Sequence, residues 1–263
     1  MIPKKIHYCW FGGNPLPDSA KKCIASWKKC MPDYEIIEWN ESNYDVRKIP
    51  YIAQAYDAKK FAFVSDFARV DILNENGGIY FDTDVEVIKD ITPIIEEGAF
   101  VGLESKGAIA TGLGMASNEG DEILKEIIES YKSESFIVTD GSLNLKTVVT
   151  RVTEIFIKHG FDINSTNKQS ILGYNIFPME YFSPKDVNTG IITLTDKTYT
   201  IHHYDASWLE DWQKTVQINK YKIFHTLGKN IISIGIVFLY HSCMALYKLG
   251  LKAGLNYIFS KIR

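Results

Sequence analysis

The feature that most constrains this chain is an apolar run at residues 79–88 that is interrupted by acidic residues, chiefly Asp82 and Asp84. The β-branched and aromatic residues of the run predict a strand, and alternate residues of a strand share one face. Two carboxylates on that face lie about 7 Å apart and repel each other, and burial alone costs each of them free energy. A divalent cation removes both costs. Because hard oxygen ligands suit Mg²⁺ or Mn²⁺, the run predicts a metal site.

A helix precedes this strand, and two charged side chains share one of its faces. Ser65 is expected to cap the helix and Gly77 to end it. Asp66 and Arg69 lie three residues apart, so they project from one side of the helix. On a surface, such an ion pair contributes little to stability. Here the pair precedes the end of an apolar strand, where open α/β sheets hold their ligands, so we include it in the predicted site.

Strand and helix signals alternate along the chain. The apolar run at 5–11 predicts a first strand, and Asp18 or Ser19 can cap the helix that follows it. Further strands are expected near 34–39, 100–103, 176–177 and 198–204, and further helices near 121–131 and 143–159. This alternation predicts the α/β class, with helices on the faces of a sheet.

Length, charge and cysteine usage limit the functional classes. A chain of 263 residues, 46% of them hydrophobic, can form one large α/β domain with an appendage. A net charge of −3 argues against nucleic acid as a partner. The four cysteines lack the spacing of a zinc site or a disulfide framework, and the amino terminus does not read as a secretory signal. We therefore expect a cytoplasmic protein with reduced thiols.

Residues 212–263 differ from the rest because they contain eight Lys or Arg and no Asp or Glu. We expect a catalytic body over 1–211 and a basic, apolar helical tail over 212–263. Residues 230–247 carry no formal charge, and a run of this length is at the lower limit for crossing a bilayer. The polar residues here fall roughly on one helical side: Asn230, Ser233, His241, Lys248 and Lys252. This favours a helix lying in an anionic membrane interface. A cap packed on the body and a transmembrane anchor are the alternatives.

The segments SDFAR at 65–69 and GGIYFDTD at 77–84 together resemble the DXD-containing glycosyltransferases with a GT-A fold. They look most like the family of Och-type mannosyltransferases, bacterial capsular polysaccharide and lipopolysaccharide glycosyltransferases, and clostridial toxin glucosyltransferase domains. The opening segments IPKKIH at 2–7 and WFGG at 10–13 are similar to the family's first strand and loop. The resemblance covers about residues 2–208. It implies a Rossmann-like GT-A fold with a mixed central sheet and helices on both faces, followed here by the C-terminal helical tail.

The resemblance also implies roles on the donor side of the site. Trp10 matches the aromatic residue that stacks on the nucleotide base. Asp66 and Arg69 match the helix pair that contacts the donor sugar and phosphates, and the planar fork of an arginine suits a diphosphate. Tyr80 shares the face of the two aspartates and is expected to line the donor pocket or to pack in the core. The segments TGLG at 111–114 and DGS at 140–142 fall where the family builds its acceptor side, although ordinary turns explain them equally well.

The implied metal ligands come from the DXD motif and from a distant histidine. Asp84 is expected to bind the metal directly, and Asp82 to reach the ribose or a metal-bound water. The segment IHHYDASW at 201–208 resembles the family's closing motif. Adjacent strand residues face opposite sides, so only one of its two histidines is a ligand, and the resemblance favours His203. Ser207 and Trp208 are expected to cover the diphosphate.

These observations predict a metal-dependent retaining glycosyltransferase with Asp84, Arg69 and Asp66 as its catalytic residues. It is expected to use Mn²⁺ or Mg²⁺ to move a hexose or N-acetylhexosamine from a nucleotide-diphosphate sugar to a glycan or lipid-linked acceptor. The expected setting is bacterial surface polysaccharide synthesis on the cytoplasmic face of the membrane. One alternative is a non-catalytic sugar-nucleotide-binding or scaffold protein at the membrane. Another is a haloacid dehalogenase-type phosphatase, whose nucleophile strand also reads apolar-D-x-D but whose downstream motifs we cannot place.

Overall fold

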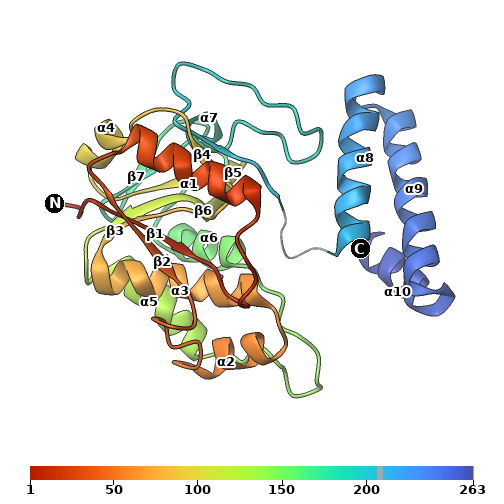
Figure 1. The fold of residues 1–263 in the computed structure, drawn as a ribbon, viewed down its shortest axis with the longest axis horizontal. Helices are drawn as coiled ribbons and strands as arrows, with labels where there is room; N and C mark the ends of the chain where they lie inside the picture. The colour runs from red at the N-terminus through yellow and green to blue at the C-terminus, as the bar shows by residue number, and fades with distance from the viewer. Residues whose placement is uncertain (206–209, 263) are drawn as a thin grey trace. The chain divides into compact units, whose positions relative to one another are not determined.

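The structure is a computed structural model that describes residues 1–205 and 210–262. It forms two compact units, which we call the sheet unit and the helical unit (Figure 1). The sheet unit comprises Met1–Pro184 and Thr193–His203, and the helical unit comprises Lys185–Ile192 and Tyr204–Arg263. The helical unit therefore includes a segment, 185–192, that precedes the boundary expected near residue 211.

A seven-stranded mixed sheet forms the centre of the sheet unit, in the order β2-β1-β3-β6-β5-β8-β7. Its strands are β1 (Lys5–Cys9), β2 (Glu35–Trp39), β3 (Gly78–Tyr80), β5 (Phe100–Ser105), β6 (Ala108–Ser117), β7 (Gln169–Ile171) and β8 (Tyr174–Phe177). Strand β1 is parallel to β2 and β3, and β5 is parallel to β8. Strand β6 is antiparallel to both β3 and β5, and β7 is antiparallel to β8. A separate antiparallel pair joins β4 (Val85–Val87) to β9 (Thr200–His202).

Helices cover both faces of the seven-stranded sheet and bury two separate cores. The first core contains side chains from α2 (Pro50–Asp57), α3 (Phe61–Asn76), α5 (Glu122–Lys132) and α6 (Val148–Lys158). The second contains side chains from α1 (Asp18–Cys30), α4 (Thr92–Glu96) and α7 (Met179–Phe182). Neighbouring strand residues divide between the two cores, as with Ile79 in the second and Tyr80 in the first. The expected α/β class, with a mixed sheet and helices on both faces, is confirmed.

Two glycines direct the chain from α3 into β3. Gly77 ends the helix with φ +59°, and Gly78 follows with φ +101°. A Cβ on Gly78 would lie 2.8 Å from the Lys5 carbonyl oxygen and 2.9 Å from His7 Nε2. The buried His7 ring lies 2.9 Å from the Gly77 oxygen through Nε2, and its Nδ1 accepts a 3.1 Å bond from Trp39 Nε1. Burial lowers the pKa of His7 to about 4, so the ring is neutral and donates from Nε2.

The expected strand over 79–88 is two strands in different sheets. Strand β3 ends at Tyr80, and a turn closed by a 3.0 Å bond from Val85 N to the Asp82 oxygen precedes β4. A continuous strand would hold both aspartates on the face that buries Tyr80, and the turn removes them from that core.

Two other boundaries also differ. Helix α3 begins at Phe61 rather than after Ser65, because Phe61, Phe63 and Val64 add an apolar turn that packs in the first core. The TGLG segment at 111–114 lies within β6, in an irregular stretch where the register with β5 shifts between Ala110 and Met115. Glycine is uncommon inside a strand and marks close approach by another group.

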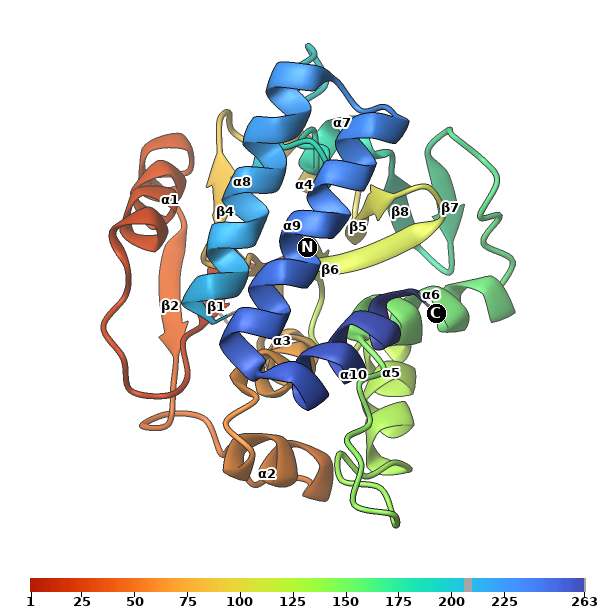
Figure 2. The same ribbon diagram turned by 90° about the vertical axis from the view of Figure 1, so that its right-hand side faces the viewer.

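The helical unit contains α8 (Asp211–Leu227), α9 (Ile231–Leu249) and α10 (Leu251–Ile262). Helices α8 and α9 lie side by side (Figure 2). Asn230 caps α9, and Gly250 ends it with φ +76°, so Lys252 belongs to the next helix. Among the residues that the structure describes, α9 is the helix long and apolar enough to cross a membrane, with mean hydropathy 1.5.

Two of the polar residues expected on the water-facing side of α9 are turned into the helical unit. Ser233 is fully buried, and His241 Nε2 lies 3.2 Å from the Tyr257 hydroxyl of α10. Asn230, Lys248 and Lys252 are exposed, and large apolar side chains of α9 are exposed as well.

Candidate metal centre

The turn after β3 brings two carboxylates against a histidine. Asp82, Asp84 and His202 each offer one ligand atom, and these atoms all lie within 4.8 Å of one another. His202 Nε2 is 3.1 Å from Asp84 Oδ1, and both side chains are less than one-fifth exposed. Pairing of β4 with β9 sets this contact, because His202 stands opposite Val85 in the register. Two carboxylates and an imidazole at this spacing fit a divalent ion such as Mn²⁺.

The structure brings His202, and not the expected His203, beside the DXD carboxylates. His203 Nε2 lies 2.9 Å from Glu86 Oε2, while His202 is the histidine next to Asp84. The two side chains point to opposite sides, as neighbouring strand residues do. The choice between the two depended on the register of β9 against β4, which the sequence does not specify.

Arg69 lies between Asp66 and Asp82 and is bound by the protein on every side. Its Nη2 is 3.0 Å from an oxygen of each of these carboxylates. Its Nε donates to the Ser65 oxygen at 3.2 Å, and its Nη1 donates to Thr111 Oγ1 at 3.4 Å. The side chain is 6% exposed. The guanidinium therefore holds the two carboxylates in place, whereas the resemblance implied a contact with phosphate.

The electrostatics of this cluster are dominated by burial and by the shared arginine. Burial by itself lowers the pKa of Arg69, but Asp82, Tyr80 and Asp66 raise it well above its usual range, so the side chain stays charged. Burial raises the pKa of Asp66 to about 6, against the opposing effect of Arg69 and of the Val148 N–H at the start of α6. A largely buried carboxylate with a raised pKa is costly to the fold and is typical of functional sites.

Tyr80 and Trp10 differ in how they relate to the cluster. Tyr80 is 1% exposed, its ring centroid lies 5.0 Å from the guanidinium carbon of Arg69, and its hydroxyl donates to Asp82 Oδ1 at 3.2 Å. It therefore packs in the core and orients Asp82. Trp10 follows β1, which is parallel to β3, so it lies at the same sheet edge as Asp82. Its ring is half-buried, with Nε1 donating to the Asn14 oxygen at 2.6 Å.

Three further residues lie near the cluster. Thr111 and Gly112 belong to β6, and Gly112 accepts a 2.7 Å hydrogen bond from the Asp82 N–H. Glu104 of β5 has its pKa raised, first by burial and also by Asp82, against the opposing effect of His202. The sequence analysis expected Thr111 and Gly112 on the acceptor side or in an ordinary turn, and it did not single out Glu104. Ser207 and Trp208 lie outside the described residues.

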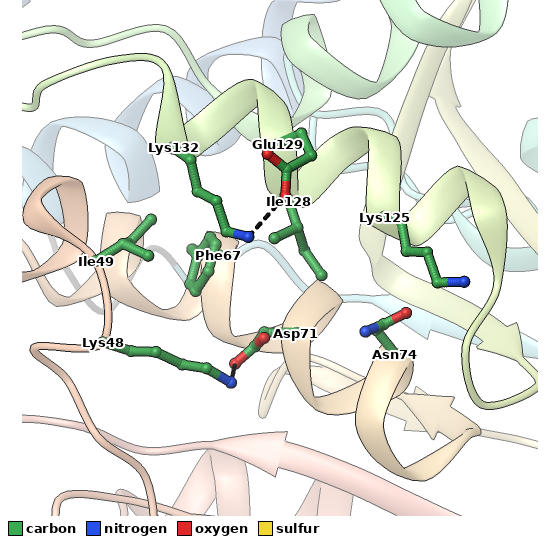
Figure 3. A pocket seen from close by; sticks show the side chains of 9 residues that line it. All are labelled: Lys48, Ile49, Phe67, Asp71, Asn74, Lys125, Ile128, Glu129 and Lys132. Carbon is green, nitrogen blue, oxygen red and sulfur yellow. Dashed lines mark hydrogen bonds and ion pairs between the residues drawn. The ribbon is translucent and has the colours of Figure 1, made fainter.

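A cavity of about 430 Å³ between α3 and α5 is lined by none of these residues. Phe67, Ile128 and Asn74 are among its lining residues (Figure 3). Its three lysines each pair with a carboxylate: Lys48 with Asp71 at 2.7 Å, Lys125 with Glu122 at 2.7 Å and Lys132 with Glu129 at 2.6 Å. Because these charges are neutralised locally, the cavity does not compete with the DXD cluster as the functional site.

Comparison with known families identifies the class of this site. Residues 17–101 match the family described as "Glycosyltransferase sugar-binding region containing DXD motif". The match includes α3, β3, the DXD turn and the start of β5. This part of the chain is therefore similar to glycosyltransferase sugar-binding regions, and the resemblance to DXD-containing glycosyltransferases expected from the sequence is confirmed.

Individual proteins and one solved structure resemble this chain over different shares of its length. Inositol phosphoceramide mannosyltransferase 3 of Schizosaccharomyces pombe is 28% identical over 142 residues, which are 51% of this chain and 38% of that protein. An uncharacterized glycosyltransferase of Acanthamoeba polyphaga mimivirus is 25% identical over 239 residues, which are 85% of this chain and 91% of that protein. Among solved structures, the PaToxG glycosyltransferase is 20% identical with a TM-score of 0.49, covering 60% of this chain and 69% of its own. The chain spans little more than a third of the length of the fission yeast relative.

We expect the two histidines to differ in their effect on metal binding. His202→Ala removes a ligand and should lower Mn²⁺ affinity at least about tenfold, because even changes to residues that support a ligand cost this much. His203→Ala is the matched control and should bind within about twofold of the unmodified protein. Titration calorimetry with Mn²⁺ measures both. Equal losses of Mn²⁺ affinity in the two variants would contradict the choice of His202 over His203. A loss confined to His203→Ala would make His203 the ligand.

The pH dependence of the same titration gives a check that needs no further site variant. Burial lowers the pKa of His202, but Asp84, Asp82 and Glu104 together raise it more, so the net pKa in the metal-free protein is raised. A metal ligand must lose its proton, so Mn²⁺ affinity should fall as pH falls through that pKa, by up to about tenfold per pH unit. The dependence should flatten in His202→Ala and persist in His203→Ala.

Proposed function

We propose that this chain is a metal-dependent glycosyltransferase that uses a nucleotide-diphosphate sugar as donor. The convergence of Asp82, Asp84 and His202 at one edge of the sheet carries this proposal, because it lies beside the region that matches glycosyltransferase sugar-binding regions. Its ligands suit Mn²⁺ or Mg²⁺, and both ions bind diphosphates. Transfer of a hexose or N-acetylhexosamine is the reaction that this arrangement supports best.

The bond that breaks joins the anomeric carbon of the sugar to a phosphate oxygen of the donor. Positive charge develops on the sugar and negative charge on the departing diphosphate. Asp84 and His202 would hold the metal, with Asp82 binding it directly or through water, and the metal supplies positive charge that stabilises the leaving group. Arg69 fixes the orientation of the Asp66 and Asp82 carboxylates. In this proposal the two carboxylates face the donor. The retaining stereochemistry that the family implies follows if the acceptor hydroxyl attacks from the face that the diphosphate leaves.

The relatives suggest which substrates to examine first. Two of the matching fungal proteins are named as inositol phosphoceramide mannosyltransferases, so mannose is the first donor sugar to test and a lipid-linked molecule the first acceptor. The match covers little more than a third of the first of these proteins. A role in bacterial surface polysaccharide synthesis is part of the proposal and rests on the sequence resemblance alone.

The reaction is tested by release of nucleoside diphosphate from a panel of nucleotide sugars, with and without Mn²⁺. We expect release from one donor that requires metal, since hydrolysis or transfer both free the diphosphate. Asp84→Asn removes the charge of one ligand and should lower the rate by about 100-fold or more, a typical loss when a group that stabilises a leaving charge is removed. Asp90→Asn is the matched control, because it neutralises an exposed aspartate of the same sheet unit.

The possible outcomes separate the proposal from its alternatives. Near-normal turnover by Asp84→Asn would contradict the proposed centre. Nucleotide-sugar binding that depends on metal, without turnover across acceptors, would favour a non-catalytic binding protein. Phosphate release from a phosphomonoester would favour the phosphatase alternative.

We further propose that the helical unit attaches the enzyme to an anionic membrane surface. Residues 212–263 contain eight basic residues and no acidic one. On α9, large apolar side chains are strongly exposed: Ile231 is 88%, Ile232 70% and Leu239 64% exposed. Soluble proteins rarely expose a continuous apolar face of this kind, and the basic charge is complementary to anionic lipid. Membrane attachment would bring the enzyme to the surface that holds a lipid-linked acceptor.

Vesicle binding by the full-length chain tests this attachment. We expect binding to vesicles of phosphatidylcholine mixed with phosphatidylglycerol, and weaker binding as salt rises. Replacing Ile232 and Leu239 together by Asp should weaken binding at least about tenfold, because each buried aliphatic side chain contributes about 1.5–3 kcal/mol. The matched control replaces Ile157 and Leu172, two exposed apolar residues of the sheet unit, by Asp. No vesicle binding, or equal losses in the two double variants, would contradict the proposal.

A further inference from the structure

Gly112 occupies an unusual position in the sheet, directly against the carboxylate of the DXD motif. It lies within β6, a central strand that pairs with β3 and β5. Its carbonyl accepts the 2.7 Å hydrogen bond from the Asp82 N–H, immediately beyond the last paired residues of β3 and β6. The strand and the turn that carries the metal ligands are therefore joined at this residue.

The space above the Gly112 Cα is filled by the site itself. A Cβ at this position would lie 1.9 Å from Asp82 Oδ2 and 2.8 Å from Arg69 Nη1. The backbone of Gly112 does not adopt the left-handed conformation that would by itself require glycine. Close approach of the two charged groups is thus the reason that a side chain does not fit.

Asp82 cannot easily move away from such a side chain. Its Oδ1 is held at 3.0 Å by Arg69 Nη2 and at 3.2 Å by the Tyr80 hydroxyl, and its N–H is held by Gly112. Arg69 is fixed in turn by Asp66, by the Ser65 oxygen and by Thr111. Any rotation that frees Asp82 Oδ2 from a methyl group breaks the contact with Arg69 or with Tyr80.

We propose that Gly112 is a positioning residue of the metal centre, and that the space over its Cα, which no side chain of its own fills, is the seat that holds the Asp82 carboxylate beside Arg69. This inference rests on the proposed metal centre. A methyl group in the seat displaces Asp82 Oδ2, separates Asp82 from Arg69 and weakens metal binding, while the surrounding sheet keeps its pairing.

Gly112→Ala tests the proposal, and Gly102→Ala is its matched control. Gly102 lies in the neighbouring strand β5, and its backbone is likewise outside the left-handed region. A Cβ there would meet only apolar side chains among its nearest atoms, Leu113 Cδ1 at 2.5 Å and Phe182 Cδ2 at 2.7 Å. Gly112→Ala therefore places an added methyl group against the charged residues of the site, and Gly102→Ala places the same group against the apolar core.

The readouts are Mn²⁺ affinity by titration calorimetry and thermal unfolding of the metal-free proteins. We expect Gly112→Ala to lose at least about tenfold in Mn²⁺ affinity, a loss comparable to that from disturbing a group that orients a metal ligand. Gly102→Ala should unfold at a lower temperature and yet keep its Mn²⁺ affinity within about twofold. Unchanged affinity in Gly112→Ala, or equal losses of affinity in both variants, would overturn the proposal.

A metal-free crystal structure of Gly112→Ala separates failure of this inference from failure of the proposed function. If the unmodified protein binds no Mn²⁺, the proposed metal centre fails. The role of Gly112 in positioning Asp82 is still tested, because the contact between Asp82 and Arg69 can be examined in the variant without metal. We expect the 3.0 Å contact between Asp82 Oδ1 and Arg69 Nη2 to be lost in the variant. A retained contact would overturn the proposal whatever the metal does.

Discussion

The arrangement of the site depends on one guanidinium shared between two carboxylates. Arg69 Nη2 lies 3.0 Å from both Asp66 and Asp82, which come from a helix and from the turn after a strand. Buried charges are tolerated when they are paired and hydrogen-bonded, and removing one partner leaves the others uncompensated. This arginine therefore holds two carboxylates of one sign close together before any metal or donor arrives.

Strand pairing in the two sheets brings the other residues of the site together from distant parts of the chain. Parallel pairing of β1 with β3 brings the segment after each strand to the same side. Antiparallel pairing of β4 with β9 carries His202 across 118 positions of sequence to Asp84. Strand β6 also contributes to the site. The Thr111 hydroxyl accepts a hydrogen bond from Arg69, and the Asp82 carboxylate packs against the Cα of Gly112. The proposed metal centre is thus assembled from pairings between strands, and no single segment contains all of its residues.

The sequence predicted the parts of this arrangement that depend on local pattern. The α/β class, the pairing of Asp66 with Arg69 and the DXD carboxylates all follow from periodicity and spacing along a short segment. The choice of His202 over His203 depends on register between strands far apart in sequence, which local pattern does not encode. Residues 111–114 were expected on the acceptor side or in an ordinary turn, whereas the structure places them in an irregular stretch of β6 with the Asp82 carboxylate against Gly112. Arg69 was expected to face phosphate, and its protein partners became visible only in three dimensions.

The most direct test of this account is anomalous diffraction from crystals grown with Mn²⁺ and a nucleoside diphosphate. The account predicts a manganese peak within about 2.0–2.3 Å of an Asp84 oxygen and of His202 Nε2, with Arg69 still bridging Asp66 and Asp82. A peak at His203 and Glu86, or an Arg69 that leaves its carboxylates to bind phosphate, would contradict it. So would a bound nucleotide with no manganese beside the DXD turn.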